Sequence, residues 1–131
     1  MKKEKKIKTT KKWLSSDKDK NMEGEMIIDV YETDEDIVIQ STIAGVMAED
    51  LDISIDKDMV TIKGHRQRTE TDKEKKYLYE ECYWGPFSRQ VILPEEVNEN
   101  KSEAVVENGV LSLKMPKIKK IQKKKIKIKD I

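Results

Sequence analysis

Residues 51–63 read LDISIDKDMVTIK, and they carry the clearest signal of secondary structure in the chain. Every second residue from Leu51 to Ile55 is apolar, so an extended backbone places these side chains on one face and the polar ones on the other. A Lys-Asp pair then suits a turn, and the alternation resumes with Val60 and Ile62. The stretch therefore predicts two adjoining β-strands that each present one apolar face.

Similar short segments lie on both sides of these two strands. Residues 26–31 and 37–42 are rich in β-branched and other apolar side chains, and the polar turn between them predicts a hairpin. Residues 105–113 predict another hairpin, because Asn108-Gly109 at its centre suits the positive φ angles of a type I′ turn.

The remaining segments favour an all-β fold. No segment repeats apolar residues with a helical period over a dozen residues, and about seven short strands within roughly 90 residues predict a two-sheet β-sandwich. Pro94 and Pro116 each end a strand, because proline donates no hydrogen bond to a sheet. Residues 67–76 are charged and have no apolar face, so they predict a long solvated loop or an arm that pairs elsewhere.

Charge is unevenly distributed along the 131 residues, although the net charge is only +1. Residues 1–12 carry +6, residues 114–131 carry +8, and the residues between them carry −13. Basic arms of this kind can bind nucleic acid, anionic lipid or the acidic bodies of other copies. We expect three parts in the chain: residues 1–24, a flexible basic and polar arm; residues 25–116, the β-sandwich; and residues 117–131, a basic tail.

Several classes of function have no support in the sequence. No apolar run approaches the roughly 18 residues of a membrane-spanning helix, so we expect a cytoplasmic protein. Cys82 is the single cysteine and His65 the single histidine, which excludes an internal disulfide and a nitrogen–sulfur zinc cage within one chain. The five glycines form no phosphate-binding motif. His65 at a strand end is better interpreted as solvated than as a catalytic base. We expect no enzyme activity, no cofactor and no metal.

Aromatic residues cluster in one part of the chain. Five of the seven fall within eleven residues, namely Tyr77, Tyr79, Tyr83, Trp84 and Phe87. Aromatic side chains can stack on nucleic-acid bases, but the acidic charge of the surrounding residues repels a polyanion. We therefore interpret the cluster as a core edge or a subunit interface.

The basic tail carries Ile126 and Ile128, two residues apart among lysines. In an extended segment both isoleucines lie on one face, which suits docking into an apolar groove beside a sheet edge. Burying two isoleucines gains at most about 3–6 kcal/mol, and ordering the tail consumes most of it. Each contact is therefore weak, whereas many contacts in a closed assembly are strong together. The alternative is a merely solubilising tail.

Four motifs in one order resemble those of the small heat shock proteins and their alpha-crystallin domain, over about residues 25–116 and the tail. They are Ala44-Gly45-Val46 before Glu49-Asp50-Leu51, Gly85-Pro86-Phe87-Ser88-Arg89 before Leu93-Pro94, Glu107-Asn108-Gly109-Val110-Leu111 before Met115-Pro116-Lys117, and Ile126-Lys127-Ile128. The resemblance implies an immunoglobulin-like sandwich, a homodimer that assembles into larger homo-oligomers, and an ATP-independent holdase. Such a chaperone binds non-native client proteins under heat or other stress and prevents their aggregation.

The resemblance also implies where copies of the chain contact one another. A charged loop, residues 67–83, would carry a strand that pairs with the first strand of a partner. The residues of this strand exchange would be Tyr77, Leu78 and Tyr79 on the loop, and Met26, Ile28 and Val30 on the first strand. The groove for the tail anchor and for clients would be formed by Leu51, Ile53, Ile55, Ala104 and Val105.

The chain departs from the family pattern at two places. Cys82 follows Glu81 where the family often has arginine, and the N-terminal arm is short and Lys-rich, with Trp13-Leu14 as its only apolar anchor. Two other functions remain open from the residues. One is a basic-tailed module that binds nucleic acid or a membrane surface, and the other is a monomeric co-chaperone domain of the same fold that acts on one defined partner.

Overall fold

A computed structural model describes residues 24–118 and 125–131 of the chain. The expectations for the first arm, Trp13-Leu14 included, lie outside these residues, as does the tail segment 119–124. The described part is all-β, as predicted, with two short 3₁₀ turns and no α-helix. Its strands are β1 Gly24–Glu25, β2 Asp29–Glu32, β3 Asp36–Thr42, β4 Leu51–Asp56, β5 Met59–Arg66, β6 Gly85–Ile92, β7 Glu103–Glu107 and β8 Val110–Pro116, and its 3₁₀ turns are η3 Ala48–Asp50 and η4 Glu99–Lys101.

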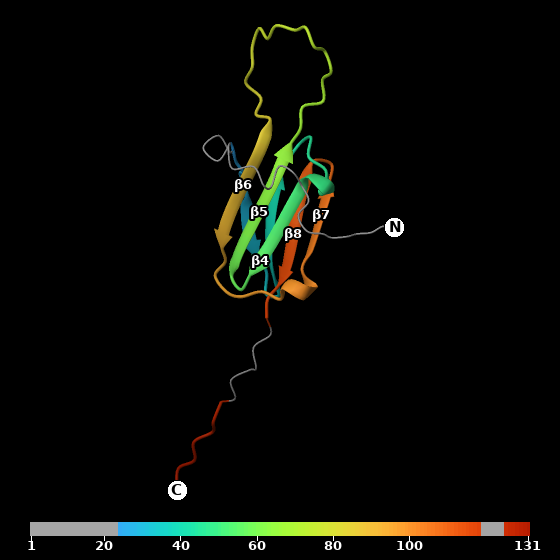
Figure 1. Cartoon of the computed structure of the whole chain (residues 1–131). Coiled ribbons are helices and arrows are strands. Elements are labelled where there is room, and N and C mark those ends of the chain that lie inside the picture. The colour runs from blue at the N-terminus through green and yellow to red at the C-terminus, as the bar shows by residue number, and fades with distance from the viewer. Residues whose placement is uncertain (1–23, 119–124) are drawn as a thin grey trace, which may run out of the picture.

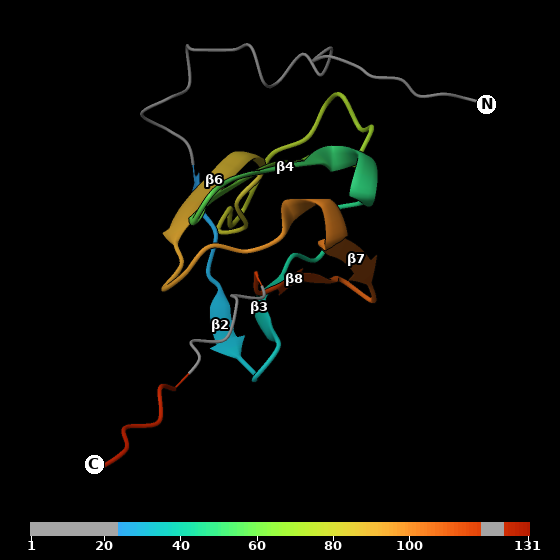
Figure 2. The ribbon, with the colours of Figure 1, turned by 90° about the horizontal axis from the view of Figure 1, so that it is seen from below.

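Eight strands form two sheets that pack face to face (Figure 1). The strand order is β1-β6-β5-β4 in one sheet and β2-β3-β8-β7 in the other. All neighbours are antiparallel except β1 and β6. Figures 1 and 2 both show the edge strands β4 and β7 at the same side of the sandwich.

The core lies between the sheets and is built from the apolar positions that alternate along the strands. Its fully buried side chains are Ile37, Ile39, Ile43, Val60, Ile62, Leu111 and Met115. Gly64 on β5 leaves room for the ring of Phe87, its cross-strand partner on β6, since a Cβ atom at Gly64 would lie 2.3 Å from that ring. The sandwich therefore depends on one residue without a side chain in the middle of a strand.

The predicted turns at Lys57-Asp58 and Asn108-Gly109 are both present, and each joins two antiparallel strands. The turn between β4 and β5 places Lys57 at a φ of 63°, and the turn between β7 and β8 has φ angles of 53° at Asn108 and 76° at Gly109. These left-handed values are the ones that an Asn-Gly pair accommodates readily. Strand β8 ends at Pro116, and β6 ends two residues before Pro94.

The first predicted strand differs from the structure. Residues 26–31 do not form one strand, because the chain crosses from one sheet to the other in this region (Figure 2). β1 pairs with β6, Met26 fills the core with an exposed fraction of only 4%, and β2 begins at Asp29. A side chain buried between the sheets interrupts the pairing that the local apolar pattern suggests.

Candidate functional site

Two edge strands present the apolar residues that the sequence assigned to a tail and client groove. On β4, Ile53 pairs with Ile62 and Ile55 with Val60, so both isoleucines share the inner face with buried core residues. Both are only partly buried and pack against the core from its rim. Leu51 precedes them on the same face and is buried.

Strand β7 contributes the other side of this surface, with one change from the expectation. Ala104 pairs with the buried Leu113 and belongs to the inner face, although it is exposed at the edge of the sheet. Val105 pairs with Ser112 and lies on the outer face with an exposed fraction of 54%. Val106, which the sequence reasoning did not name, pairs with Leu111 and packs against the core. The predicted two-residue Asn-Gly turn pairs Glu107 with Val110 and therefore Val106 with Leu111, so the register of this hairpin would have identified it. We call Leu51, Ile53, Ile55, Ala104 and Val106 the edge seam.

The first-strand residues proposed for strand exchange do not share one environment. Met26 is buried in the core, and Ile28 packs against the core from its rim. Val30 lies on β2 and is 44% exposed. Within the described residues β2 pairs only with β3, so its other edge has unpaired backbone groups that a strand from another chain can meet.

The loop between β5 and β6 extends beyond the sandwich and holds the other residues proposed for strand exchange (Figure 1). Leu78 and Tyr79 are more than four-fifths exposed, whereas Tyr77 is held by Arg68. The Arg68 guanidinium donates a hydrogen bond to the Tyr77 hydroxyl, and its carbon lies 4.9 Å from the centroid of the Tyr77 ring. It also donates to the Glu80 carboxylate at 2.6 Å.

A second ion pair lies within this loop. The Lys75 ammonium lies 2.9 Å from the Glu70 carboxylate, and the hydrogen bond from Lys75 holds the pKa of Glu70 below its usual value. Cys82 is exposed and carries a free thiol.

Arg68 organises the loop because it holds both Tyr77 and Glu80. No pattern in the sequence distinguishes it from the other charged residues around it.

Residues of the motifs that resemble the small heat shock proteins fix segments of the backbone. The Arg89 guanidinium donates to the Met26 carbonyl at 2.8 Å, which fixes the crossing between the sheets. Phe87 is buried against Gly64, and Gly85 has a φ of 118°. Gly45, with a φ of 81°, lies beside the side chain of Arg66, which donates to the Ala44 carbonyl at 2.7 Å. These contacts hold segments of the backbone in place.

The root of the tail is fixed at the end of β8. The Lys117 ammonium lies 2.8 Å from the carboxylate of Glu32 on β2 and 3.7 Å from that of Glu95. Its backbone N–H donates to the Glu35 carbonyl at 2.8 Å. The hydrogen bond to Glu32 raises the pKa of Lys117 above its ordinary value.

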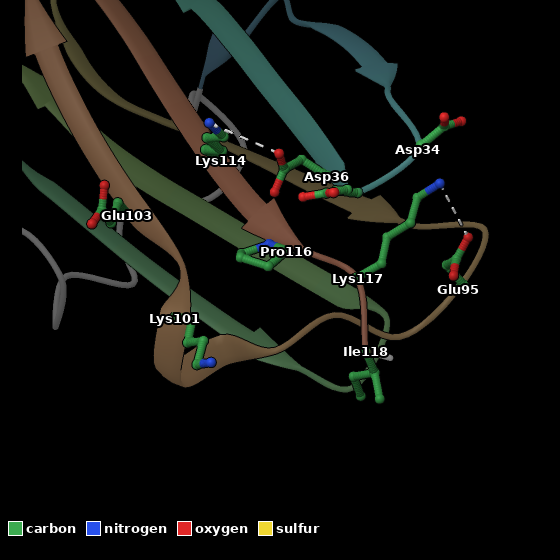
Figure 3. Close-up of a pocket in the computed structure, with 10 residues that line it drawn as sticks. Asp34, Asp36, Glu95, Lys101, Glu103, Lys114, Pro116, Lys117 and Ile118 are labelled. Atoms are coloured by element: carbon green, nitrogen blue, oxygen red, sulfur yellow. Dashed lines mark ion pairs between the residues drawn. The ribbon is translucent and has the colours of Figure 1, made fainter. Parts of the chain in front are cut away.

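A hollow of about 690 Å³ lies beside this root (Figure 3). Charged side chains of both signs line it, among them Asp34, Asp36, Lys101, Lys114 and Lys117. The tail anchor itself, Ile126 and Ile128, lies beyond the root and is exposed, with fractions of 86% and 92%.

Neither a membrane-spanning helix nor a metal-binding cluster is found among the described residues. No helix among residues 24–118 and 125–131 has the length and apolar character to cross a membrane. In the same part of the chain, no three His, Cys, Asp or Glu side chains lie together in a way that suits a metal ion.

Comparisons with known proteins agree with this architecture. A family model described as the Hsp20/alpha crystallin family matches residues 29–129. Small heat shock protein C2 of Rickettsia felis is 35% identical over 101 residues, which is 77% of this chain and 66% of that protein. Small heat shock protein C4 of the same organism is 34% identical over 76% of this chain and 61% of its own length. The chain thus spans less than two thirds of the length of these curated relatives.

This chain covers a larger share of two proteins of known structure. Heat shock protein 16.0 from Schizosaccharomyces pombe superposes with a TM-score of 0.68 at 31% sequence identity, over 82% of this chain and 100% of that chain. A small heat-shock protein from Xylella fastidiosa superposes with a TM-score of 0.65 at 24% identity, over 80% of this chain and 96% of that chain, and this likeness concerns the fold.

Proposed function

The chain belongs to the Hsp20/alpha crystallin family, and from this premise we propose that it is an ATP-independent holdase that binds unfolding proteins and prevents their aggregation under heat or other stress. One observation carries the proposal. The folded sandwich leaves apolar side chains exposed between β1 and β2, on its loop and on its tail, the most exposed being Ile27, Leu78, Tyr79, Ile126, Ile128 and Ile131. Surfaces of this kind bind the apolar segments that unfolding proteins expose.

In the proposed resting state other copies cover these surfaces. The loop residues Leu78 and Tyr79 meet the open edge of β2 in a partner, which gives a homodimer. Ile126 and Ile128 dock at the edge seam of a neighbouring copy, which links dimers into larger homo-oligomers. Each dock involves two isoleucines and is weak by itself, so the assembly depends on many of them.

Heat then exchanges tails for clients. A marginal dock opens readily as temperature rises, and clients expose apolar segments over the same range. A client segment that occupies the freed seam is kept from meeting a second unfolding chain. This step uses binding alone, so the proposal assigns the protein no catalysis and no cofactor.

We propose the cytoplasm as the compartment in which the protein works. The exposed free thiol of Cys82 supports this assignment, because an exposed cysteine in an oxidising compartment is open to cross-linking.

The first test is light scattering from a heat-labile enzyme that is warmed without ATP, with and without this chain. We expect the chain to suppress the rise in scattering at about equimolar subunits, and an unrelated protein at the same mass concentration to leave it unchanged. The mass of the chain is measured beforehand by size exclusion with static light scattering. A monomer that leaves aggregation unchanged would overturn the proposal in favour of a co-chaperone domain with one partner.

The basic tail supports a second candidate function, a module that binds polyanions. It predicts salt-sensitive binding to nucleic acid or anionic vesicles that is lost when residues 117–131 are deleted. The acidic charge of the sandwich opposes this function, so we expect weak binding in the same assay.

A further inference from the structure

The outer faces of the two edge strands carry carboxylates on both sides of the edge seam. On β4 the residues that alternate with the seam are Asp52, Ser54 and Asp56, and on β7 they are Glu103, Val105 and Glu107. All six side chains are exposed. Strands β4 and β7 lie at the same side of the sandwich (Figures 1 and 2). The apolar edge seam is therefore flanked by two acidic rows, one on the outer face of each strand.

Within the described residues, none of these four carboxylates has an ion-pair partner. Asp36 pairs with Lys114, and Glu32 and Glu95 pair with Lys117. By contrast, no ion pair within residues 24–118 and 125–131 involves the four carboxylates of the rows, Asp52, Asp56, Glu103 and Glu107. Their negative charge is thus available to a cationic segment, and it also repels the same acidic edge of another copy.

The described end of the tail has a matching pattern of charge. Lys125, Lys127 and Lys129 alternate with Ile126 and Ile128, so an extended backbone places the lysines on the face opposite the isoleucines. The lysine row spans four residues, about 13 Å, as do the pairs Asp52/Asp56 and Glu103/Glu107. The long flexible stem of lysine lets the ammonium turn toward either acidic row while the isoleucines face the seam.

We infer that the acidic rows of the edge seam select the lysine-flanked tail of a second copy, so that charge as well as apolar burial determines which segment occupies the seam. This inference rests on the proposed assembly through tails. It deepens that proposal by stating the chemistry of the occupant, an extended segment in which isoleucine alternates with lysine. A client segment without lysines then occupies the seam only when heat or salt has weakened the tail.

Salt dependence is the first consequence. The proposed pairs between tail lysines and the acidic rows are exposed to solvent. Salt screens their attraction beyond about 10 Å at 0.1 M, and beyond a shorter distance at higher salt. Each exposed pair changes affinity by about two- to fivefold, so three pairs together change it about tenfold or more. Raising sodium chloride from about 0.05 to 0.5 M should therefore shrink the assembly of the full chain.

A charge-swap experiment on the full chain tests the inference, with assembly mass at low salt from static light scattering as the readout. Asp52→Lys with Asp56→Lys should shrink the assembly and remove its salt dependence. Lys125→Glu with Lys127→Glu and Lys129→Glu should do the same, and combining both sets should restore the mass. Circular dichroism confirms that each variant keeps its sheet content.

The matched control is Asp34→Lys with Glu35→Lys, which makes the same change of charge at exposed residues of the hollow in Figure 3. We expect it to leave the assembly unchanged. A loss of mass in this control but not in the β4 variant would overturn the inference and assign the tail to the hollow.

Failure of the inference differs from failure of the proposed function. If Ile126→Ser with Ile128→Ser shrinks the assembly while all charge variants keep the wild-type mass, apolar docking stands and selection by charge is wrong. If the isoleucine variant also keeps its mass, tail docking itself is wrong and the inference falls with it.

Discussion

Lys117 connects three parts of the molecule through one side chain. Its ammonium pairs with Glu32 on β2 and with Glu95 before β7, while its own backbone continues from β8 into the tail. The residue therefore fixes the root of the tail next to the strand whose open edge we assign to the dimer contact.

The raised pKa of Lys117 predicts its behaviour in alkaline solution. The hydrogen bond to Glu32 favours the charged ammonium, so the contact contributes fully below the ordinary lysine pKa of 10.5 and is lost as pH rises through the higher folded-state value. We expect the ¹⁵Nζ resonance of Lys117 to titrate above the ordinary lysine pKa of 10.5, and Glu32→Gln to lower its midpoint toward that value. Measuring the chain with and without Glu32→Gln in the Ile126→Ser, Ile128→Ser background keeps the species small. A midpoint that Glu32→Gln leaves unchanged would contradict the contact in solution.

Some features of the strands follow from local sequence patterns, whereas others depend on residues that are far apart in the chain. The β4–β5 and β7–β8 hairpins follow from alternation and from the Asn-Gly turn, because both depend on neighbours in the chain. The burial of Met26 depends instead on residues far away in the sequence, because the preceding strand β1 pairs with β6 and Arg89 binds the Met26 carbonyl. Val106 is an intermediate case. Its inward direction is set by pairing with Leu111, which the predicted hairpin already contained.

The β5–β6 loop depends on Arg68 in the same non-local way. Its contacts reach Tyr77, Glu80 and Trp84, which are nine to sixteen residues away along the chain. Sequence patterns identify the loop as charged and solvated, but they do not show which charge holds it. The exposed Leu78 and Tyr79 lie on the segment that this arginine restrains.

Replacing Arg68 should loosen the loop and weaken the dimer. Arg68→Met removes the charged hydrogen bonds to Tyr77 and Glu80, and we expect amide hydrogen exchange over residues 69–80 to rise about tenfold, which corresponds to the loss of about one charged hydrogen bond. Sedimentation should show a larger fraction of monomer. Lys73→Met makes the same change of charge at an exposed loop residue and should alter neither readout. A dimer that is unaffected by Arg68→Met would remove the loop from the subunit contact.

At the scale of the whole molecule, charge and apolar surface are divided between body and tail. The sandwich with its acidic rows repels other sandwiches, and the lysine-rich tail attracts them. In the proposed assembly, association proceeds through a segment that carries both lysine and isoleucine, while net repulsion between bodies limits non-specific aggregation. We expect this assembly to be reversible because its apolar contacts involve only two side chains per tail.

Removing those two side chains should dissolve the assembly without unfolding its subunits. Ile126→Ser with Ile128→Ser eliminates the apolar part of each dock, so we expect a species of dimer mass with an unchanged thermal unfolding midpoint. Both isoleucines lie outside the core, which is why the fold does not depend on them. Size exclusion with static light scattering gives the mass, and near-ultraviolet circular dichroism follows the unfolding.

Two other isoleucines in the same tail supply the matched control for this change. Ile118→Ser with Ile131→Ser makes an identical change in composition at exposed positions outside the Ile-x-Ile pair. If spacing by two residues is what the seam recognises, this control keeps the wild-type mass. If both double variants shrink the assembly equally, the tail acts through its total apolar content, and alternate side chains have no specific places at the seam. If the first variant gives monomers, the same isoleucines also hold the dimer, and the loop then carries less of that contact than its exposed residues suggest.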